Sequence, residues 1–319
     1  MSHASTILDA ASGDGAPAVP TATGVDGAAD ADADDGARVG VAELAGRRIA
    51  LIGAGTMGNA IALGLARAAA FPAAELRVVN RHAAAADALA ARIAGARATD
   101  ASAACADADI VLLCVKPRDV AGVLAGLAAD DALARDDRAA APLIISIAAG
   151  VSTAAIEEGT GGRVPVVRAM PNTASAIGKG CTVVAAGARA TAAHVATATA
   201  IFACVGRCLT LDERHLDAVT AVSASGPAFI YVVLEALTDG AVSCGLPRAA
   251  ATELVARMTL GAAEMVLATG RHPAALKDDV TTPGGCTIAG LLVLEDGRAR
   301  SVLARTIETT TRVAAALSR

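Results

Sequence analysis

Residues 48–59, with the sequence RIALIGAGTMGN, decide the fold of this chain. The apolar run at residues 49–52 is typical of a strand buried in a parallel sheet. Gly53, Gly55 and Gly58 follow at the GxGxxG spacing and lead into a helical stretch. In such a loop the first glycine permits a tight turn, the second lets the backbone approach a pyrophosphate, and the third lets helix and strand pack closely. The segment therefore predicts a dinucleotide-binding site, with a glycine turn that binds no ligand as the alternative.

Outward from this segment, apolar runs alternate with helical stretches. We expect further strands at residues 76–80, 97–99, 110–115, 143–147, 164–170, 181–185 and 208–211, and helices at 59–70 and 83–94. This alternation predicts a parallel sheet covered on both faces. The later pattern is helical alone, at residues 213–224, 227–244, 248–269, 273–280, 285–294 and 298–317. We therefore expect an α/β Rossmann-type domain at residues 46–211 and an all-α part at residues 212–319.

The N-terminal residues 1–45 are rich in Ala, Asp, Gly, Ser and Thr and contain little bulky apolar material. Such a segment cannot bury enough surface to offset the entropy of ordering, so we expect a disordered acidic tail. The net charge of −5 originates there. Residues 1–46 hold eight carboxylates against Arg38 alone, which leaves the rest of the chain almost neutral.

Composition excludes several classes of function. With no Trp, one Tyr, three Phe and a net charge of −5, nucleic-acid binding is disfavoured. We expect no membrane span, because the best candidate, residues 227–246, is interrupted by Glu235 and Asp239. The seven cysteines are scattered without a CxxC pair, which favours reduced thiols in a cytoplasmic protein and no metal site. No secretory or transit signal is expected at the N-terminus.

The end of the second expected strand indicates which dinucleotide binds. NAD sites usually carry Asp or Glu there, whose carboxylate takes the ribose hydroxyls. This chain has Asn80-Arg81-His82 instead. A carboxylate would repel a 2′-phosphate, whereas Arg81 would attract one and can bind it bidentately. The sequence therefore favours NADPH, and NADH is the alternative cofactor. In the alternative interpretation, Arg81 is a solvated charge in a loop and binds no cofactor.

Two more strand ends supply the wall of the site. Val115-Lys116-Pro117 and Ala148-Ala149-Gly150 follow apolar strands. Ligands of open α/β sheets lie outside the carboxyl ends of the strands, so these loops are expected to flank the nicotinamide. Alternatively, Lys116 is a surface lysine that happens to follow a strand.

The stretch 277–288, KDDVTTPGGCTI, predicts an anion site. Its glycines precede a helix, so successive backbone N–H groups can form a nest for a small carboxylate. Thr281, Thr282 and Thr287 add hydroxyl groups. A well-capped helix start explains the same residues equally well.

Together these motifs resemble the pyrroline-5-carboxylate reductase family, from about residue 47 to the C-terminus. The matching pieces are the glycine loop with Asn80-Arg81, and residues 112–117 (LLCVKP), 145–150 (ISIAAG), 167–173 (VRAMPNT), 221–229 (AVSASGPAF) and 276–288. The resemblance implies a Rossmann domain followed by a C-terminal dimerisation domain. It also implies NADPH-dependent reduction of 1-pyrroline-5-carboxylate to L-proline, the last step of proline biosynthesis, by hydride transfer to the cyclic imine carbon.

The resemblance also assigns site residues. It places substrate on Thr282, Gly285, Cys286, Thr287 and Ala149, and catalysis on Thr287 and Lys116, with Thr287 contacting the pyrroline nitrogen. The implied cofactor-binding residues are Gly53, Ala54, Gly55, Thr56, Met57, Gly58, Asn80, Arg81, Cys114, Val115, Lys116, Pro117, Ile147, Ala148 and Ala149. No metal is implied.

The family forms homodimers through its helical half, so the substrate site is expected to be built from two chains, with a decamer of five dimers as the larger assembly. The apolar character of the helices after residue 213 independently favours an oligomer. The chain departs from the family pattern at Ala101, Ala174, Ala224 and Asp279. Asp279 matters most, because a carboxylate beside an anion site would repel the substrate.

Two other functions remain as alternatives. The first is a β-hydroxyacid dehydrogenase or ketol reductase, which would use a Lys in a long C-terminal helix; the stretch 248–269 contains none. The second is a dinucleotide-binding protein without catalytic activity. It would bind NADPH and turn over neither imines nor ketones.

Overall fold

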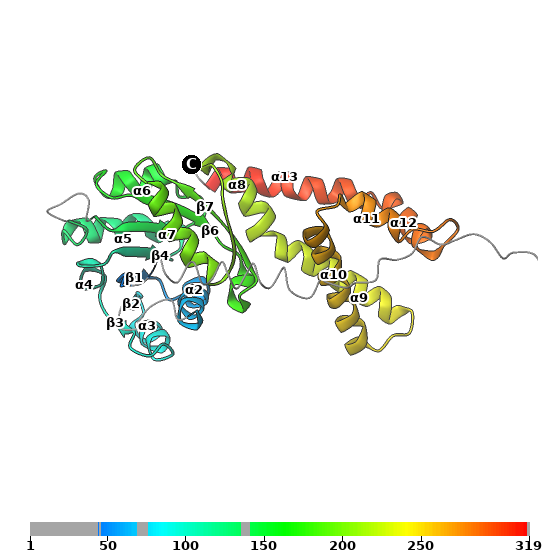
Figure 1. Cartoon of the computed structure of the whole chain (residues 1–319), viewed down its shortest axis with the longest axis horizontal. Helices are drawn as coiled ribbons and strands as arrows, with labels where there is room; N and C mark the ends of the chain where they lie inside the picture. The colour runs from blue at the N-terminus through cyan, green and yellow to red at the C-terminus, as the bar shows by residue number, and fades with distance from the viewer. Residues whose placement is uncertain (1–43, 45, 69–75, 135–140, 318–319) are drawn as a thin grey trace, which may run out of the picture.

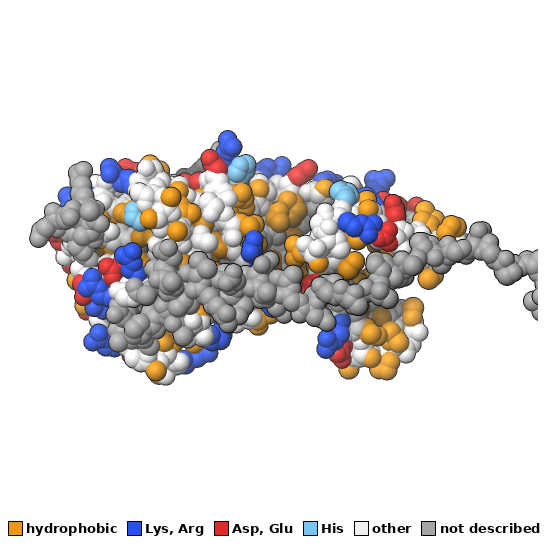
Figure 2. All heavy atoms as spheres, viewed as in Figure 1, with side chains coloured by type: hydrophobic (Ala, Val, Ile, Leu, Met, Phe, Trp, Pro, Cys, Tyr) orange, Lys and Arg blue, Asp and Glu red, His pale blue; other side chains and the backbone are white. Residues whose placement is uncertain are grey.

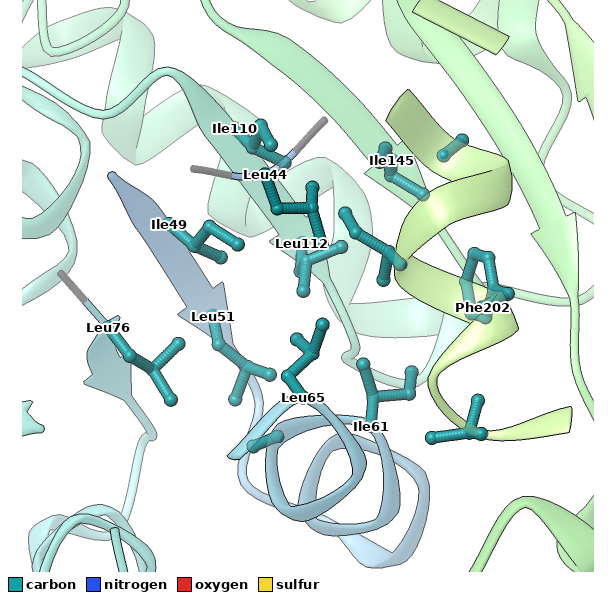
Figure 3. Packing of buried hydrophobic residues seen from close by; sticks show 14 of the residues in the cluster. Leu44, Ile49, Leu51, Ile61, Leu65, Leu76, Ile110, Leu112, Ile145 and Phe202 are labelled. Carbon is teal, nitrogen blue, oxygen red and sulfur yellow. The ribbon is translucent and has the colours of Figure 1, made fainter. Parts of the chain in front are cut away.

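The computed structural model describes residues 44, 46–68, 76–134 and 141–317. The expected disordered tail therefore lies outside the described residues, with one exception. Leu44 is fully buried, and it lies among core residues of the sheet such as Ile110 and Leu112 (Figure 3). The expectation that ordered structure begins at about residue 47 is wrong at this position, because Leu44 completes the apolar cluster on one face of the sheet.

Eight strands form a single sheet in the order β3-β2-β1-β4-β5-β6-β7-β8. The strands are β1 (Ile49–Ile52), β2 (Leu76–Val79), β3 (Arg97–Ala98), β4 (Ile110–Leu113), β5 (Leu143–Ser146), β6 (Val166–Met170), β7 (Gly180–Ala186) and β8 (Gly206–Thr210). Each expected strand is present, with bounds shifted by a few residues. Strands β1 to β6 are parallel to one another.

The sheet is not parallel throughout, which corrects the sequence-based expectation. Strand β7 runs antiparallel to β6, and β8 is parallel to β7. Only a short 3-10 segment, η3 (Thr173–Ile177), joins β6 to β7. A parallel pair needs a crossover of a dozen or more residues, so this connection returns the chain in the opposite direction.

Helices cover both faces of the sheet, as expected (Figure 1). Alternate residues of β1 point to opposite faces: Ile49 and Leu51 join one buried cluster, Ala50 and Ile52 the other. The first cluster includes residues of α2 (Thr56–Arg67), α3 (Ala83–Ala90) and α7 (Ala192–Ala203). The second includes residues of α4 (Ala101–Cys105), α5 (Pro117–Ala129) and α6 (Thr153–Gly159). Helix α2 begins three residues earlier than expected, and α4 to α7 were not assigned from the sequence.

The remainder of the chain, residues 213–317, is helical and is called the helical arm here. It consists of η4 (Glu213–His215), α8 (Leu216–Val219), η5 (Thr220–Ala224), α9 (Gly226–Ser243), α10 (Arg248–Thr269), α11 (Pro273–Asp279), α12 (Cys286–Asp296) and α13 (Ala299–Leu317). The expected single helix at 213–224 is instead a 3-10 turn, an α turn and a π segment. The bond from the Ser225 N–H to the Thr220 carbonyl, 2.9 Å, spans five residues and makes the π segment.

The arm extends away from the sheet, and α13 runs back along it so that its end reaches the sheet domain (Figure 1). Many large apolar side chains on the arm are exposed, among them Tyr231, Leu267 and Val293. Hydrophobic side chains are visible over the far end of the arm in Figure 2. A monomeric protein rarely exposes so much apolar surface, which points to a covering partner.

One continuous helical run, Glu213–Ser243, is long and apolar enough to cross a membrane, judged by length and composition only. The expectation above concerned uninterrupted apolar residues, and Glu235 and Asp239 do interrupt this run.

Candidate functional site

The glycine loop between β1 and α2 has two positions that admit no side chain. Gly53 has φ +111°, and a Cβ there would lie 2.6 Å from the Cys114 carbonyl oxygen. A Cβ at Gly58 would lie 2.0 Å from the Gly53 carbonyl oxygen. These contacts bring α2 tightly against the ends of β1 and β4. Gly55 differs, because nothing lies within 4 Å of a Cβ built there.

The start of α2 is open to an anion. Its N-cap residue, Gly55, makes no side-chain capping bond, and the first turn holds no acidic residue. The backbone N–H groups of Thr56, Met57 and Gly58 precede the first bond of this helix, from the Asn59 N–H to the Gly55 carbonyl, and have no partner within the helix. Unpaired N–H groups at a helix start favour a phosphate by both hydrogen bonding and the helix dipole. This geometry fits a dinucleotide pyrophosphate.

Asn80, at the end of β2, holds the loop in shape. Its Oδ1 accepts a hydrogen bond from the Ala54 N–H at 3.2 Å, and its Nδ2 donates to the His82 carbonyl at 3.1 Å. The neighbouring Arg81 side chain is exposed, with its Nη1 3.7 Å from Oδ1 of Asp119 on α5. Arg81 thus lies beside the glycine loop, and its long ion pair with Asp119 leaves the guanidinium able to bind a phosphate as well.

The residues expected to flank the nicotinamide lie beside this loop. The Cys114 N–H donates to the Ile52 carbonyl at 2.8 Å and the Ile147 N–H to the Leu113 carbonyl at 3.1 Å, so the ends of β1, β4 and β5 lie side by side. Ala148 is buried and Val115 and Ala149 are half-buried. Burial raises the pKa of the Cys114 thiol to about 12. Cys114 therefore stays protonated at neutral pH and acts as an apolar surface.

Lys116 and Pro117 begin α5 at the same edge. Lys116 is the N-cap residue and Pro117 occupies the first helical position, where a missing N–H costs nothing. The Lys116 side chain is exposed. The structure thus brings all of the expected cofactor-binding residues to one edge of the sheet.

The glycine–threonine turn lies between α11 and α12. Gly284 has φ +69°, and the Gly285 N–H donates to the Thr282 carbonyl at 3.0 Å. Gly285 caps α12 without a side-chain bond, and the first turn of α12 has no acidic residue. The N–H groups of Cys286 and Thr287 are therefore available to an anion. Thr282 and Cys286 are exposed and Thr287 is half-buried.

Asp279, where the chain departs from the family pattern and a carboxylate was expected to repel the substrate, pairs with Arg271. Arg271 Nη1 and Nη2 donate to its two carboxylate oxygens at 2.6 and 3.1 Å. The bidentate hydrogen bonds from Arg271 lower the pKa of Asp279 from its usual value. The carboxylate remains charged, but Arg271 counters that charge at the end of α11.

Within one chain the two candidate sites are far apart. Figure 1 places α12 at the far end of the arm, whereas α2 and β1 lie in the sheet domain. The expected substrate residues Thr282, Gly285, Cys286 and Thr287 therefore do not meet Ala149 or the cofactor loop in the same chain. Ala149 instead packs against a buried cluster that includes Leu216, at the start of the arm.

Sequence reasoning missed the residues that join the arm to the sheet. Asn172 Nδ2 donates to Ser223 Oγ at 3.2 Å, and Ser223 Oγ donates to the Cys181 carbonyl at 3.0 Å. Glu213 and the buried Arg168 form a second link. The only sequence signal for either link was a charged residue inside the apolar run of β6.

No group of three or more His, Cys, Asp or Glu residues that could hold a metal ion occurs within the described ranges. The seven cysteines all lie in the described residues, and none of them forms a disulfide. Two histidines cap helices: Nδ1 of His194 accepts from the Thr191 N–H at 3.0 Å, and Nδ1 of His272 accepts from the Ala274 N–H at 3.2 Å. These two side chains therefore accept hydrogen bonds at helix starts.

Comparison with protein families assigns both halves of the chain. Residues 213–317 match the model described as pyrroline-5-carboxylate reductase dimerisation. Residues 48–150 match the model described as NADP oxidoreductase, coenzyme F420-dependent. The second match ends at residue 150, after β5, and the first begins at residue 213, where the arm begins.

Individual relatives agree with these matches. The chain is 40% identical over 256 residues to a pyrroline-5-carboxylate reductase from Synechocystis, an alignment that spans 80% of this chain and 92% of the relative. A solved pyrroline-5-carboxylate reductase from Coxiella burnetii superposes with a TM-score of 0.78 at 32% identity, over 86% of this chain and 99% of that one. The Plasmodium falciparum pyrroline carboxylate reductase, solved with NADP bound, gives 0.76 at 26% identity, with coverages of 86% and 99%.

Proposed function

The chain belongs to the pyrroline-5-carboxylate reductase family, and we propose that it reduces 1-pyrroline-5-carboxylate to L-proline with NADPH. The observation that carries the proposal is a pair of uncapped helix starts, at α2 and α12, each preceded by glycines. One suits a pyrophosphate and the other a small carboxylate. A dinucleotide and an amino-acid-like anion are the two reactants of this reaction.

The sheet domain holds the cofactor. The N–H groups at the start of α2 bind the pyrophosphate through the space beside Gly55, and Arg81 meets the 2′-phosphate, which favours NADPH over NADH. The full cofactor contact set is Gly53, Ala54, Gly55, Thr56, Met57, Gly58, Asn80, Arg81, Cys114, Val115, Lys116, Pro117, Ile147, Ala148 and Ala149. NADPH, when bound there, supplies the hydride that adds to the imine carbon.

The turn before α12 holds the substrate. Backbone N–H groups of Cys286 and Thr287 and the Thr282 hydroxyl bind its carboxylate, and Gly285 lets the substrate approach the turn. The Thr287 hydroxyl orients the ring nitrogen of the substrate and relays a proton between that nitrogen and solvent. Lys116 places a positive charge beside the nicotinamide. Positioning is the main task, and holding two reactants in line lowers a barrier by about 7–11 kcal/mol.

The complete site needs two chains. In one chain α12 lies far from the sheet, and the arm matches a dimerisation model. We propose a homodimer in which the arm of one subunit brings Thr287 to the cofactor loop and Ala149 of its partner. The exposed apolar side chains of α9, α10, α12 and α13 support this pairing. Five such dimers form the proposed decamer.

Domain division and location follow from the same proposal. A cofactor domain at residues 46–211 and a dimerisation and substrate domain at 212–319 are supported by the end of β8 at Thr210 and the start of η4 at Glu213. A cytoplasmic location is supported by the seven cysteines, none of which forms a disulfide. The apolar run Glu213–Ser243 is assigned to contacts between subunits, since it lies inside the matched dimerisation region.

The test is a steady-state assay of NADPH oxidation with 1-pyrroline-5-carboxylate, with proline identified as the product. We expect turnover, a lower KM for NADPH than for NADH, and a loss of about tenfold or more in kcat for Thr287→Ala. A folded, oligomeric sample that binds NADPH but turns over no imine would establish the non-catalytic alternative instead. Helix α10 contains no Lys, which counts against the β-hydroxyacid dehydrogenase alternative.

A further inference from the structure

The turn between β5 and α6, residues 147–152, is held from both ends of the helical arm. Ala149 packs against a buried cluster that contains Leu216, at the start of the arm, together with Met170 and Val183. Gly150 has φ +77°, and a Cβ there would lie 2.9 Å from the carbonyl oxygen of Leu317, at the end of α13. This is the same turn that flanks the nicotinamide in the proposed function.

Glu213, the first residue of the arm, bonds directly to the residue after this turn. Its Oε1 accepts from the Thr153 N–H at 2.8 Å, and its Oε2 accepts from the Thr153 hydroxyl at 2.6 Å. Thr153 is buried and begins α6. Hydrogen bonds to a carboxylate are among the stronger ones in proteins, so the pair ties the end of the turn to the arm.

A buried arginine fixes Glu213 in turn. Arg168 on β6 is only 4% exposed, and its Nη1 lies 3.3 Å from Glu213 Oε1. Its Nη2 lies 3.9 Å from Asp217 Oδ1. Within the described part of the chain, Nε and Nη2 make no hydrogen bond. A charge buried this deeply persists only beside opposite charges, so Arg168 strongly constrains where the Glu213 carboxylate lies.

We propose that Glu213 is a positioning residue for hydride transfer: through Thr153 it fixes the turn 147–152 against which the nicotinamide binds. The inference rests on the proposed function, because it requires the cofactor to lie against this turn. Glu213 acts through Thr153 and is not itself a catalytic residue. The arm of each subunit would thereby have two tasks. It completes the substrate site at the cofactor loop of the partner subunit, and it fixes the turn that positions the nicotinamide in its own subunit.

The proposal predicts that Glu213→Ala lowers kcat and leaves the KM for NADPH nearly unchanged. The phosphates of NADPH are held by the α2 start and Arg81, which Glu213 does not contact, so Glu213→Ala should change the KM for NADPH by less than about threefold. A loosened turn misplaces the nicotinamide, and a shift of about 1 Å can cost about 100-fold in rate. We therefore expect kcat to fall about 10- to 100-fold. The primary isotope effect with NADPH deuterated at the transferred position should rise, because hydride transfer becomes slower.

A second measurement needs no cofactor. The Thr153 amide hydrogen is bonded to Glu213, so in the ligand-free oligomer its exchange with solvent should accelerate in Glu213→Ala, together with that of the preceding turn. The matched control is Glu158→Ala, which removes an exposed carboxylate from the same helix α6. It should leave exchange, kcat and the isotope effect unchanged.

A milder pair of variants covers the case in which Glu213→Ala fails to fold. Thr153→Ala removes one hydrogen bond to Glu213 and leaves the Arg168 ion pair in place, whereas Thr153→Ser keeps the hydroxyl. We expect Thr153→Ala to lower kcat and raise the isotope effect, and Thr153→Ser to restore both. Size-exclusion chromatography checks that each variant keeps the wild-type assembly.

The outcomes are distinct. Wild-type kcat, isotope effect and Thr153 exchange in folded Glu213→Ala would overturn the inference, as would Thr153→Ala and Thr153→Ser behaving alike. Absence of imine turnover in the wild-type protein would instead overturn the proposed function. In that case, unchanged exchange at Thr153 in Glu213→Ala would independently refute the link between arm and turn.

Discussion

The three glycines of the cofactor loop perform different tasks at the residue scale. Gly53 and Gly58 let the chain pack against itself, because a Cβ at either position would meet a backbone carbonyl. Gly55 has free space around it, and that space is where the pyrophosphate is proposed to lie. The motif alone does not distinguish a packing glycine from a binding glycine, whereas the distances do.

Alanine at Gly55 and at Gly58 should therefore separate binding from folding. Gly58→Ala forces a clash with the Gly53 carbonyl and should lower stability by about 1–3 kcal/mol, seen as a lower Tm. Gly55→Ala should leave Tm within error of the wild type and raise the Kd for NADPH. Calorimetric titration and thermal unfolding of both variants check this, and equal Tm losses in the two would contradict it.

Arg81 is the residue proposed to select the cofactor. Loss of a charged hydrogen bond to the 2′-phosphate costs about 1.5–3 kcal/mol. Arg81→Ala should therefore raise the KM for NADPH about 10- to 100-fold and leave the KM for NADH nearly unchanged. Parallel titrations with the two cofactors measure the ratio. A variant that loses both cofactors equally would assign Arg81 to the loop structure instead.

The clearest feature at the element scale is the clamp between α10 and α11. Arg271, just after α10, binds Asp279, the last residue of α11, through two hydrogen bonds. The clamp counters a negative charge three residues before Thr282. Sequence alone shows Asp279 beside an anion site and predicts repulsion; the pairing across a helical connection is what offsets it.

Arg271→Ala should expose that charge and raise the KM for pyrroline-5-carboxylate several-fold at low salt. The effect should shrink as salt rises, since added ions screen exposed charges separated by more than about 10 Å at 0.1 M. Arg271→Ala combined with Asp279→Asn should return the KM to near the wild-type value. Initial rates across a salt series test this, and a double variant as poor as the single one would show that the clamp acts through structure.

At the scale of the whole molecule, the decisive feature is the distance between the two halves of the site in one chain (Figure 1). A site made of two subunits can be reconstituted from two damaged ones, provided that the lesions lie in different halves. A site contained in one chain cannot.

Co-expression of Gly55→Asp with Thr287→Ala should therefore restore activity that neither variant has alone. Each mixed dimer has one site with an intact glycine loop from one subunit and an intact Thr287 from the other. Random pairing of equal amounts should yield about a quarter of wild-type kcat. Differentially tagged subunits purified in tandem give the mixed species. Its inactivity, with both parent variants folded and oligomeric, would place the site within one chain.

The strands, the glycine loop, the use of NADPH and the glycine–threonine turn can be predicted from the amino-acid sequence, because each depends on neighbouring residues and local backbone geometry. The reversed direction of β7, the burial of Leu44 and the separation of the two half-sites cannot, because they depend on contacts between distant segments. The hydrogen bonds between Thr153 and Glu213, 60 residues apart in the sequence, belong to the same group. Such contacts form when the arm packs against the sheet, because the buried Arg168 then pairs with the carboxylate that lies nearest to it, that of Glu213.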